Sequence, residues 1–266
     1  MAGLTNYMKE KLLEHFFNAA STFTSPTTIY IGLDTIVGTE AGGGTEVTGT
    51  GYVRAAITFG AYASRRIASD VQVNWAAGSN WGTVNGFRLW DAPSGGNALA
   101  FGRIQPSTTI NNGGSFSLMA GEVVIDLANT FPFGPYLVQR LLEKGFQNVS
   151  HATFAGSLWM HLVTTRPTND GVGGVALAAT GYSSKAATFA AYGNGRCFLS
   201  ADISYTTSAP AAWGTIPAWV LMDNATFGSG NFLAVGDISP VPTFANAAPV
   251  ALDAGSTFIG LIQGSA

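Results

Sequence analysis

The strongest constraint on the fold is that the second half of the sequence repeats the first. Matched residues recur in the same order, at an offset that rises from 129 positions near the start to 134 near the end. The matched segments are residues 7–17, 29–33, 50–52, 81–83 and 97–106, which recur as 136–146, 158–162, 180–182, 213–215 and 231–240. Self-similarity at one period predicts two copies of a single structural unit.

A short Pro- and Gly-containing segment separates the two copies. The sequence Phe-Pro-Phe-Gly-Pro at 131–135 is typical of a point where a strand ends and a helix begins. We therefore expect a first unit at residues 1–129 and a second, homologous unit at 130–266. So short a connection predicts two units packed side by side rather than joined by a flexible linker.

Each unit is expected to begin with a short amphipathic helix. Thr5 or Asn6 can cap the first helix, and Pro135 is a favoured first residue for the second. Lys9, Glu10, Glu14 and His15 fall on the expected solvent side of the first helix. The apolar positions at helical spacing are Tyr7, Met8, Leu12, Phe16 and Ala19-Ala20 in the first helix, and Leu137, Leu141, Leu142 and Phe146 in the second.

The remaining segments alternate with the period of a β-strand. Apolar residues at every second position predict one buried face in residues 28–34, in 158–162 and in 122–127. Clusters of Gly, Ser, Asn and Pro separate these segments, and no helices alternate with them. The chain is therefore predicted to be mainly β, with two tandem antiparallel β-sandwich or jelly-roll-like units. A partly open barrel is the alternative.

Charge is scarce in this chain. Only 10% of the residues are Asp, Glu, Lys or Arg, against roughly 25% in a typical soluble domain, and the net charge is −3. Such a surface is either covered by neighbouring proteins or kept soluble by hydroxyl groups. The only paired basic residues, Arg65-Arg66, are interpreted as a solvated turn, so nucleic-acid binding is not expected. The sequence shows neither an apolar run of membrane-spanning length nor a secretion signal, so we expect no membrane partner and synthesis in a host cytoplasm.

No catalytic, cofactor-binding or metal-binding residues are predicted. The three histidines are assigned to the polar side of the first helix (His15), to a loop (His151) and to a strand (His161), where the matching residue of the first copy is Gly32. They lack the converging ligands that a metal site needs. Cys197 is predicted to be a small buried side chain, because a single cysteine cannot form an internal disulfide.

Two duplicated residue pairs have both a structural and a functional interpretation. Asp91 and Asp223 each precede a turn, where an Asp side chain can accept hydrogen bonds from backbone amides two residues on. The functional alternative for these residues is a general base, which has no acid partner in the sequence. Trp81 and Trp213 suit either a buried core or a platform for glycan binding. Their recurrence in both copies favours the structural interpretation. The glycine-rich residues 42–44 lack the lysine of a phosphate-binding loop and are interpreted as a loop tip.

The first copy resembles a family of phage virion proteins often labelled tail-fibre proteins. The resemblance lies in LTNYMKEKLLEHFF, TTIYIGL, GTGYVRAAITFG, WGTVNGFRLWDAPSGGNALAFGRI and MAGEVVIDL, and covers residues 4–127. The second copy is a diverged version, with WGTIPAWVLMD at the corresponding place. The resemblance implies a virion protein and carries no catalytic residues with it.

These observations predict a non-enzymatic structural protein of the virion. It would be tail-associated or a decoration protein on the capsid. Through its β units it would form a homo-oligomer and would also bind other virion proteins. The alternative is a lectin-like module that contacts glycans on the host surface through exposed tryptophans. No cofactor is expected for either.

Overall fold

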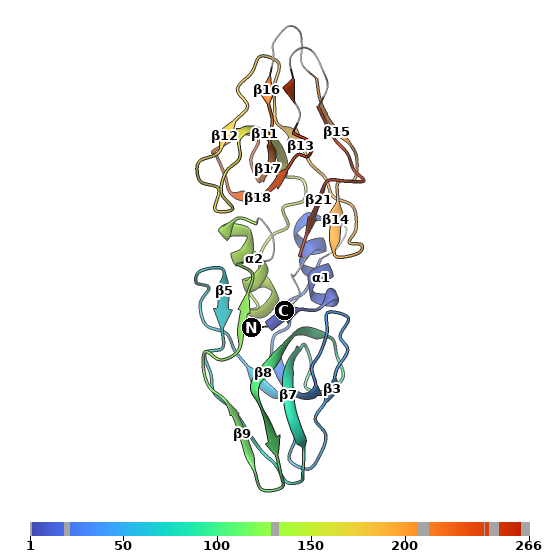
Figure 1. Ribbon diagram of the computed structural model, residues 1–266, viewed down its shortest axis with the longest axis vertical. Helices are drawn as coiled ribbons and strands as arrows, with labels where there is room; N and C mark the ends of the chain where they lie inside the picture. Colours follow the sequence, from blue (N-terminus) through green and yellow to red (C-terminus); the bar gives the residue numbers. More distant parts are fainter. Residues whose placement is uncertain are drawn as a thin grey trace.

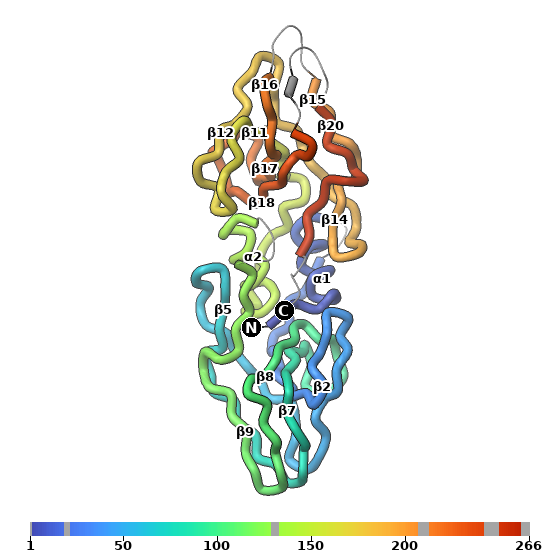
Figure 2. The backbone as a smooth tube through the Cα atoms, viewed as in Figure 1, coloured from blue at the N-terminus to red at the C-terminus, as the bar shows by residue number. Residues whose placement is uncertain are grey.

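The computed structural model describes residues 2–18, 22–128, 133–206, 213–241, 243–244 and 250–261, with only the backbone described at 243–244. The molecule is elongated, with a β-rich lobe at each end and two helices between the lobes (Figure 1). The backbone trace runs through one lobe in the first half of the sequence and through the other in the second half (Figure 2). The two lobes lie at opposite ends of the long axis, and the halves meet where the two helices contact each other (Figure 1).

The first half forms one large sheet and a separate hairpin. The sheet has the strand order β3-β2-β7-β8-β1-β10-β5, with β4 also paired to β2, while β6 pairs with β9. All of these pairings are antiparallel except that of β1 with β10. The elements are β1 (Ala2–Leu4), α1 (Asn6–Phe17), β2 (Ile29–Ile36), β3 (Thr45–Glu46), β4 (Ala55–Ile57), β5 (Arg66–Ala68), β6 (Val73–Ala76), β7 (Gly82–Trp90), β8 (Ala98–Ile110), β9 (Ser115–Leu118) and β10 (Val124–Asp126).

The second half repeats this element order. Strands β12-β11-β17-β18 form a sheet with β13 paired to β11, and β14–β21, β15–β20 and β16–β19 form antiparallel pairs. The elements are α2 (Pro135–Phe146), β11 (Trp159–Thr165), β12 (Val175–Ala176), β13 (Lys185–Ala186), β14 (Arg196–Phe198), β15 (Ile203–Tyr205), β16 (Gly214–Thr215), β17 (Ala218–Met222), β18 (Phe232–Asp237), β19 (Thr243–Phe244), β20 (Val250–Leu252) and β21 (Phe258–Gly260).

Strand register is the same in both halves. Ile31 lies opposite Leu89 in the first half, and their counterparts Met160 and Leu221 lie opposite each other in the second. Even β1, which the sequence did not predict, has a counterpart, because the pairing of Leu4 with Ala100 recurs as a bridge between Phe133 and Ala234. The predicted fold of two β-sandwich-like units, each with a leading helix, is confirmed. The division into domains at 129/130 stays a prediction.

Both helices begin where the sequence predicted. The Thr5 hydroxyl accepts a hydrogen bond from the Met8 N–H (3.3 Å) and donates one to the Ala98 carbonyl (2.6 Å), so it caps α1 and ties it to β8. Pro135 is the first residue of α2. Helix α1 ends at Phe17, and the predicted Ala19-Ala20 turn lies outside the described residues.

The predicted solvent side of α1 is wrong at two positions. Lys9 and His15 are 2% and 6% exposed. Lys9 is covered by the first-half loop that carries Glu40, with which it forms an ion pair (2.9 Å), and His15 is covered by the second-half loop around His151. Both are buried because α1 is enclosed from more than one side, whereas Glu10 and Glu14 remain partly exposed as expected.

One hydrophobic core runs through both halves. The buried cluster continues from the first sheet across α1 and α2 to the second sheet. The residues predicted to face inward are buried, including Ile29, Ile31 and Leu33 on β2 and Leu158, Met160 and Leu162 on or beside β11. Burial of this apolar surface is the main force that holds the two halves together.

Candidate functional site

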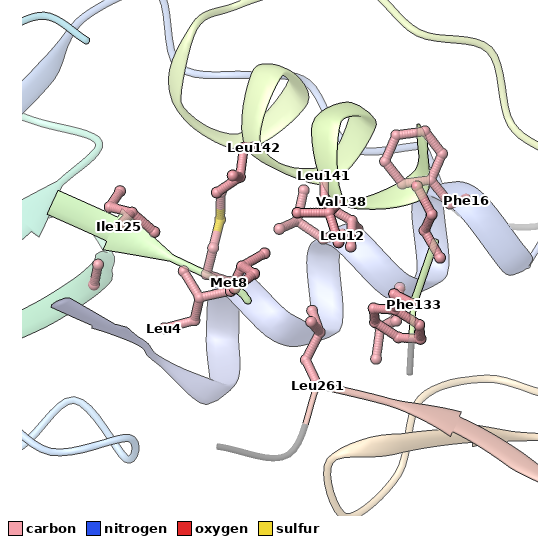
Figure 3. Close-up of a cluster of buried hydrophobic side chains, with 14 of the residues drawn as sticks. Leu4, Met8, Leu12, Phe16, Ile125, Phe133, Val138, Leu141, Leu142 and Leu261 are labelled. Carbon is pink, nitrogen blue, oxygen red and sulfur yellow. The ribbon is translucent and has the colours of Figure 1, made fainter. Parts of the chain in front are cut away.

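The contact between the two halves is built around the crossing of α1 and α2. Figure 3 shows Leu12 of α1 and Leu141 of α2, which occupy the same position in the repeat, pointing toward each other. A side chain on Gly145, near the end of α2, would lie 2.4 Å from the Met8 Cε, near the start of α1. The helices are therefore antiparallel, with matched residues at their crossing point.

Aromatic pairs on either side of this crossing are related in the same way. Phe17 of α1 contacts Phe189 of the second half, with ring centroids 5.6 Å apart. Their counterparts, Phe146 of α2 and Phe59 of the first half, contact each other at 5.9 Å, and both pairs have an interplanar angle of 67°. Reciprocal contacts of this kind characterise a two-fold interface, in which one patch meets a copy of itself. The chain therefore contains a pseudo-two-fold pair within one polypeptide.

Arg65 links the halves at one edge of this interface. Its guanidinium donates to the Phe133 carbonyl (2.7 Å) and the Asn169 carbonyl (3.0 Å) and pairs with Asp170 (2.5 Å). The interpretation of Arg65-Arg66 as a solvated turn is therefore wrong for Arg65, because Arg65 reaches across to the second half.

The backbone of Arg65 is strained, and its side-chain contacts to the second half offset this strain. Ser64 and Arg65 have φ of 49° and 66°, whereas the matched turn of the second half has Asn194 and Gly195 with φ of 51° and 83°. Asn-Gly is the favoured pair for such a turn, and an arginine there is disfavoured by about 1 kcal/mol. The three contacts to the second half compensate for this strain.

A second polar cluster occurs on one side of the interface only. The neutral ring of His15 accepts the Phe23 N–H at Nδ1 (3.3 Å) and donates from Nε2 to the His151 carbonyl (2.8 Å). The His151 ring in turn lies 2.8 Å from a Glu143 carboxylate oxygen and 2.5 Å from the Arg140 guanidinium. Burial lowers the pKa of both histidines, and the Arg140 charge lowers that of His151 further. The sequence did not indicate this cluster, because Glu143 lies eight positions before His151.

His161 lies on β11 and is 2% exposed, and its Nε2 is 3.0 Å from the Asn224 carbonyl. Burial lowers its pKa. Its matched residue is Gly32, where a side chain would lie 2.8 Å from the Glu46 carboxylate and 3.2 Å from the Trp90 ring. The second half has Ala176 and Met222 at those two places, which leaves room for the imidazole. His161 therefore fills space in its lobe.

The predicted turn aspartates have the same role in both halves. Asp91 accepts hydrogen bonds from the backbone N–H (2.7 Å) and side-chain amide (2.8 Å) of Asn97, and Asp223 accepts the same two bonds from Asn231. The turn role is confirmed, but the partner lies six or eight residues on rather than two. The longer spacing arises because each Asp closes a whole loop.

The predicted tryptophans belong to the core. Trp81 and Trp213 are 4% and 3% exposed, and their Nε1 groups donate to the Thr50 and Thr180 carbonyls. Each ring meets a tyrosine edge-on, Tyr52 in the first half and Tyr182 in the second. Neither tryptophan is an exposed glycan platform. Cys197 is also fully buried, as predicted, and burial raises the pKa of its thiol to about 12.

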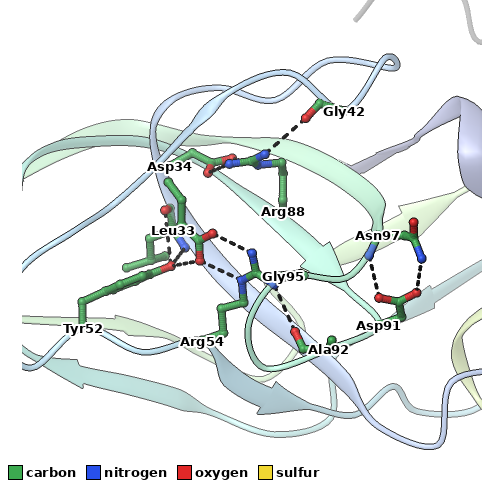
Figure 4. A network of polar contacts seen from close by, with 11 residues as sticks. Leu33, Asp34, Gly42, Tyr52, Arg54, Arg88, Asp91, Ala92, Gly95 and Asn97 are labelled. Carbon is green, nitrogen blue, oxygen red and sulfur yellow. Dashed lines mark hydrogen bonds and ion pairs between the residues drawn. The ribbon is translucent and has the colours of Figure 1, made fainter.

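A network of charged side chains occupies the sheet of the first half (Figure 4). Two nitrogens of the Arg88 guanidinium donate to the two Asp34 oxygens at 2.7 Å each, and both side chains are almost fully buried. Arg54 binds both Glu46 oxygens (2.8 and 2.7 Å), and the Tyr52 hydroxyl donates to the same carboxylate. The sequence analysis did not identify this network.

Burial and hydrogen bonding act in opposite directions on these carboxylates. Burial raises the pKa of Asp34, and the hydrogen bonds and charge of Arg88 oppose that rise. Burial also acts to raise the pKa of Glu46, but hydrogen bonds from Arg54 and Tyr52 outweigh it and hold that pKa below its usual value. The network is satisfied internally, which is typical of a structural rather than a catalytic cluster.

Within the described ranges, no three His, Cys, Asp or Glu side chains gather where they could hold a metal ion. Neither described helix is long and apolar enough to cross a membrane. The fold and the interface thus define a β protein built from two related halves.

The family comparison agrees with this class. A family model described as Podophage GP4 fiber I protein gp80 matches residues 3–126 and matches again at 132–259. The chain belongs to this family and is a structural protein of a phage virion. The two matched regions correspond to the two halves of the structure, so the resemblance inferred from the sequence is confirmed. No curated protein matches the sequence.

Proposed function

We propose that this protein is a non-enzymatic, tail-associated fibre component in which two fused units act as one elongated building block. It assembles with further copies of itself and with other virion proteins through its β lobes. Capsid decoration is the competing location.

The observation that carries this proposal is the pseudo-two-fold interface. The reciprocal phenylalanine pairs and the shared core join the halves end to end, with the lobes directed away from each other. Such a block presents two related but different surfaces at its ends. That arrangement suits a spacer or connector between unlike neighbours in a particle.

We further propose that the chain has no catalytic, cofactor-binding or metal-binding residues. In the described part of the chain, the histidines and the duplicated aspartates are engaged in contacts that hold loops or the interface together. The lectin-like alternative has less support, because Trp81 and Trp213 lie in the core.

The location can be tested by electron microscopy of purified virions labelled with antibody fragments against this chain. Label on the tail supports the proposal, whereas label spread over the capsid faces contradicts it. Sedimentation velocity of the purified chain tests self-assembly, for which we expect a species larger than 27.5 kDa.

A further inference from the structure

A short segment of the second half closes over the end of α1. The Phe154 N–H donates to the Phe16 carbonyl (2.9 Å), and the Thr153 hydroxyl donates to the same oxygen (3.3 Å). The buried Phe154 ring stacks on the Phe16 ring, with centroids 5.3 Å apart. Residues 151–154, which we call the latch, therefore join the second half to the last turn of the first-half helix.

His15 of α1 is held in the neutral form by two backbone groups. Its Nδ1 faces the Phe23 N–H, which can only donate, and its Nε2 faces the His151 carbonyl, which can only accept. One ring nitrogen must therefore be free of a proton while the other carries one. A second proton, added at Nδ1, would face the Phe23 N–H and break that hydrogen bond.

His151 of the latch is held in the same form by two side chains of α2. Its Nδ1 lies 2.5 Å from the Arg140 guanidinium, which can only donate, and its Nε2 lies 2.8 Å from a Glu143 carboxylate oxygen. A second proton at Nδ1 would set an imidazolium against a guanidinium. Two neighbouring histidines, one from each half, are thus kept neutral by partners that cannot exchange roles.

The surroundings of the two rings also oppose a positive charge. Burial is the main cause that lowers the pKa of both histidines. Lys144 lowers both pKa values further and Arg140 lowers that of His151, whereas Glu143 acts in the opposite direction on His151. The adjoining segments 22–28 and 147–158 contain no other Asp, Glu, Lys, Arg or His. The charged groups near the pair therefore come from α2.

Comparison of the halves shows that the fold does not require this pair. Lys144 stands at the place of His15 on α2, and Thr22 stands at the place of His151. The phenylalanine contacts of the interface, in contrast, occur on both sides. The histidine pair is therefore an addition to one side of a symmetric interface.

We propose that His15 and His151 form an acid-sensitive switch, which releases the latch from α1 when the pair takes up a proton. At neutral pH both rings are uncharged and the latch is closed. In the open form the rings regain the ordinary histidine pKa of about 6.5, so protons favour that form below this pH. The apolar core that joins the halves does not titrate, so the opening is confined to the latch. The inference holds for either location on the virion.

Hydrogen exchange of the full chain, followed by NMR at pH 7.5 and 5.0, tests this proposal. Protection factors are compared, because they correct for the intrinsic dependence of exchange on pH. We expect the protection of the Phe23 and Phe154 amides to fall about tenfold in acid. The Ala77 amide, which donates to the Gly114 carbonyl beside the hairpin of β6 and β9, should keep its protection.

His15→Gln and His151→Gln each remove one titrating ring and retain an uncharged side chain that can form hydrogen bonds. Each should reduce the fall at Phe154 to less than about threefold. The matched control is His161→Gln, which removes a buried histidine of lowered pKa from β11 and should leave the fall unchanged.

Constant protection of both amides at the two pH values would overturn the proposal, as would a full fall in both latch variants. An equal fall at Ala77 would also overturn it, because that result indicates global unfolding. A fall that either latch variant suppresses supports the switch. Imidazole ¹⁵N shifts of the unaltered chain provide a second test that does not depend on the variants. Both rings must carry their proton on Nε2 at pH 7.5, and the other tautomer at either ring would contradict the mechanism.

Discussion

The two lobes have the same strand pairing, yet corresponding regions of their two sheets are stabilised in opposite ways. The first lobe buries the ion pair of Asp34 and Arg88, whereas the second has Val163 and Val220 at the matched positions. Those valines form a small apolar cluster with Ala218, Met222 and Val235. The chain therefore offers a natural comparison between a buried ion pair and its apolar replacement.

This difference shows that the fold does not require charge at this place. Taking an ion pair out of water costs about as much as the attraction within the pair returns, so apolar residues of similar size can replace both partners. Removal of one partner is different, because it leaves a buried charge without compensation. The predictions below use one half as the reference for the other.

The largest effect is expected from breaking the ion pair. Arg88→Val should lower the free energy of unfolding by about 3–5 kcal/mol, because Asp34 is left buried and unpaired. The double variant Asp34→Val/Arg88→Val should recover most of this loss, since it reproduces the residues of the second lobe. Urea denaturation measures both. A double variant as unstable as the sum of the two single variants would show that the lobes are not interchangeable here.

The next effect concerns the reciprocal aromatic contacts. Phe59→Ala and Phe189→Ala should each lower the free energy of unfolding by about 3 kcal/mol, because each leaves a cavity beside its helix. The two losses should agree to within about 1 kcal/mol if the interface is reciprocal, whereas strongly unequal losses would argue against it. Chemical denaturation provides the values, and Val53→Ala, at an exposed position, serves as the control.

A smaller effect is expected at the strained turn. Arg65→Gly removes about 2 kcal/mol of contacts to the second half but regains about 1 kcal/mol from the left-handed backbone, so we expect a net loss of about 1 kcal/mol. Arg65→Ala keeps the strain and should be the less stable of the two variants. Ser64→Gly, which relieves strain without removing a contact between the halves, should stabilise the protein. The opposite order of melting temperatures for the two Arg65 variants would contradict this account.

The smallest effect is a dependence on pH. The pKa values of His15, His151 and His161 are lowered in the folded state, so below pH 6.5 the unfolded chain takes up protons more readily than the folded one. Stability should therefore decrease as the pH falls from about 6.5 toward the folded-state pKa values. Urea denaturation at pH 7.5 and 5.5 measures this change. His15→Gln should reduce the dependence, and a wild-type protein that gains stability on acidification would exclude the mechanism.

The sequence predicted the parts of the fold that follow from local pattern. The repeat, the start of α2 at Pro135, the inward faces of β2 and β11 and the core role of Trp81 and Trp213 all follow from spacing or recurrence. These features depend on residues that are close in the chain or present in both copies.

The parts that were missed depend on contacts between residues far apart in the chain, some between the halves and some within one half. Helical spacing identifies one apolar face, so it could not show that α1 is enclosed by both halves and that Lys9 and His15 are buried. One overlooked signal was available, because comparison of the copies places Asp34 against Val163. A charge at a position that is apolar in the other copy indicates a buried partner, which is Arg88.

The central claim is that the halves meet through reciprocal contacts about a pseudo-two-fold axis. Nuclear Overhauser spectra of the chain with labelled phenylalanine rings test it most directly. We predict cross-peaks between Phe17 and Phe189 and between Phe59 and Phe146, whose ring centroids lie 5.6 and 5.9 Å apart. The presence of one cross-peak without the other, or of a cross-peak between Phe17 and Phe59, would contradict the account.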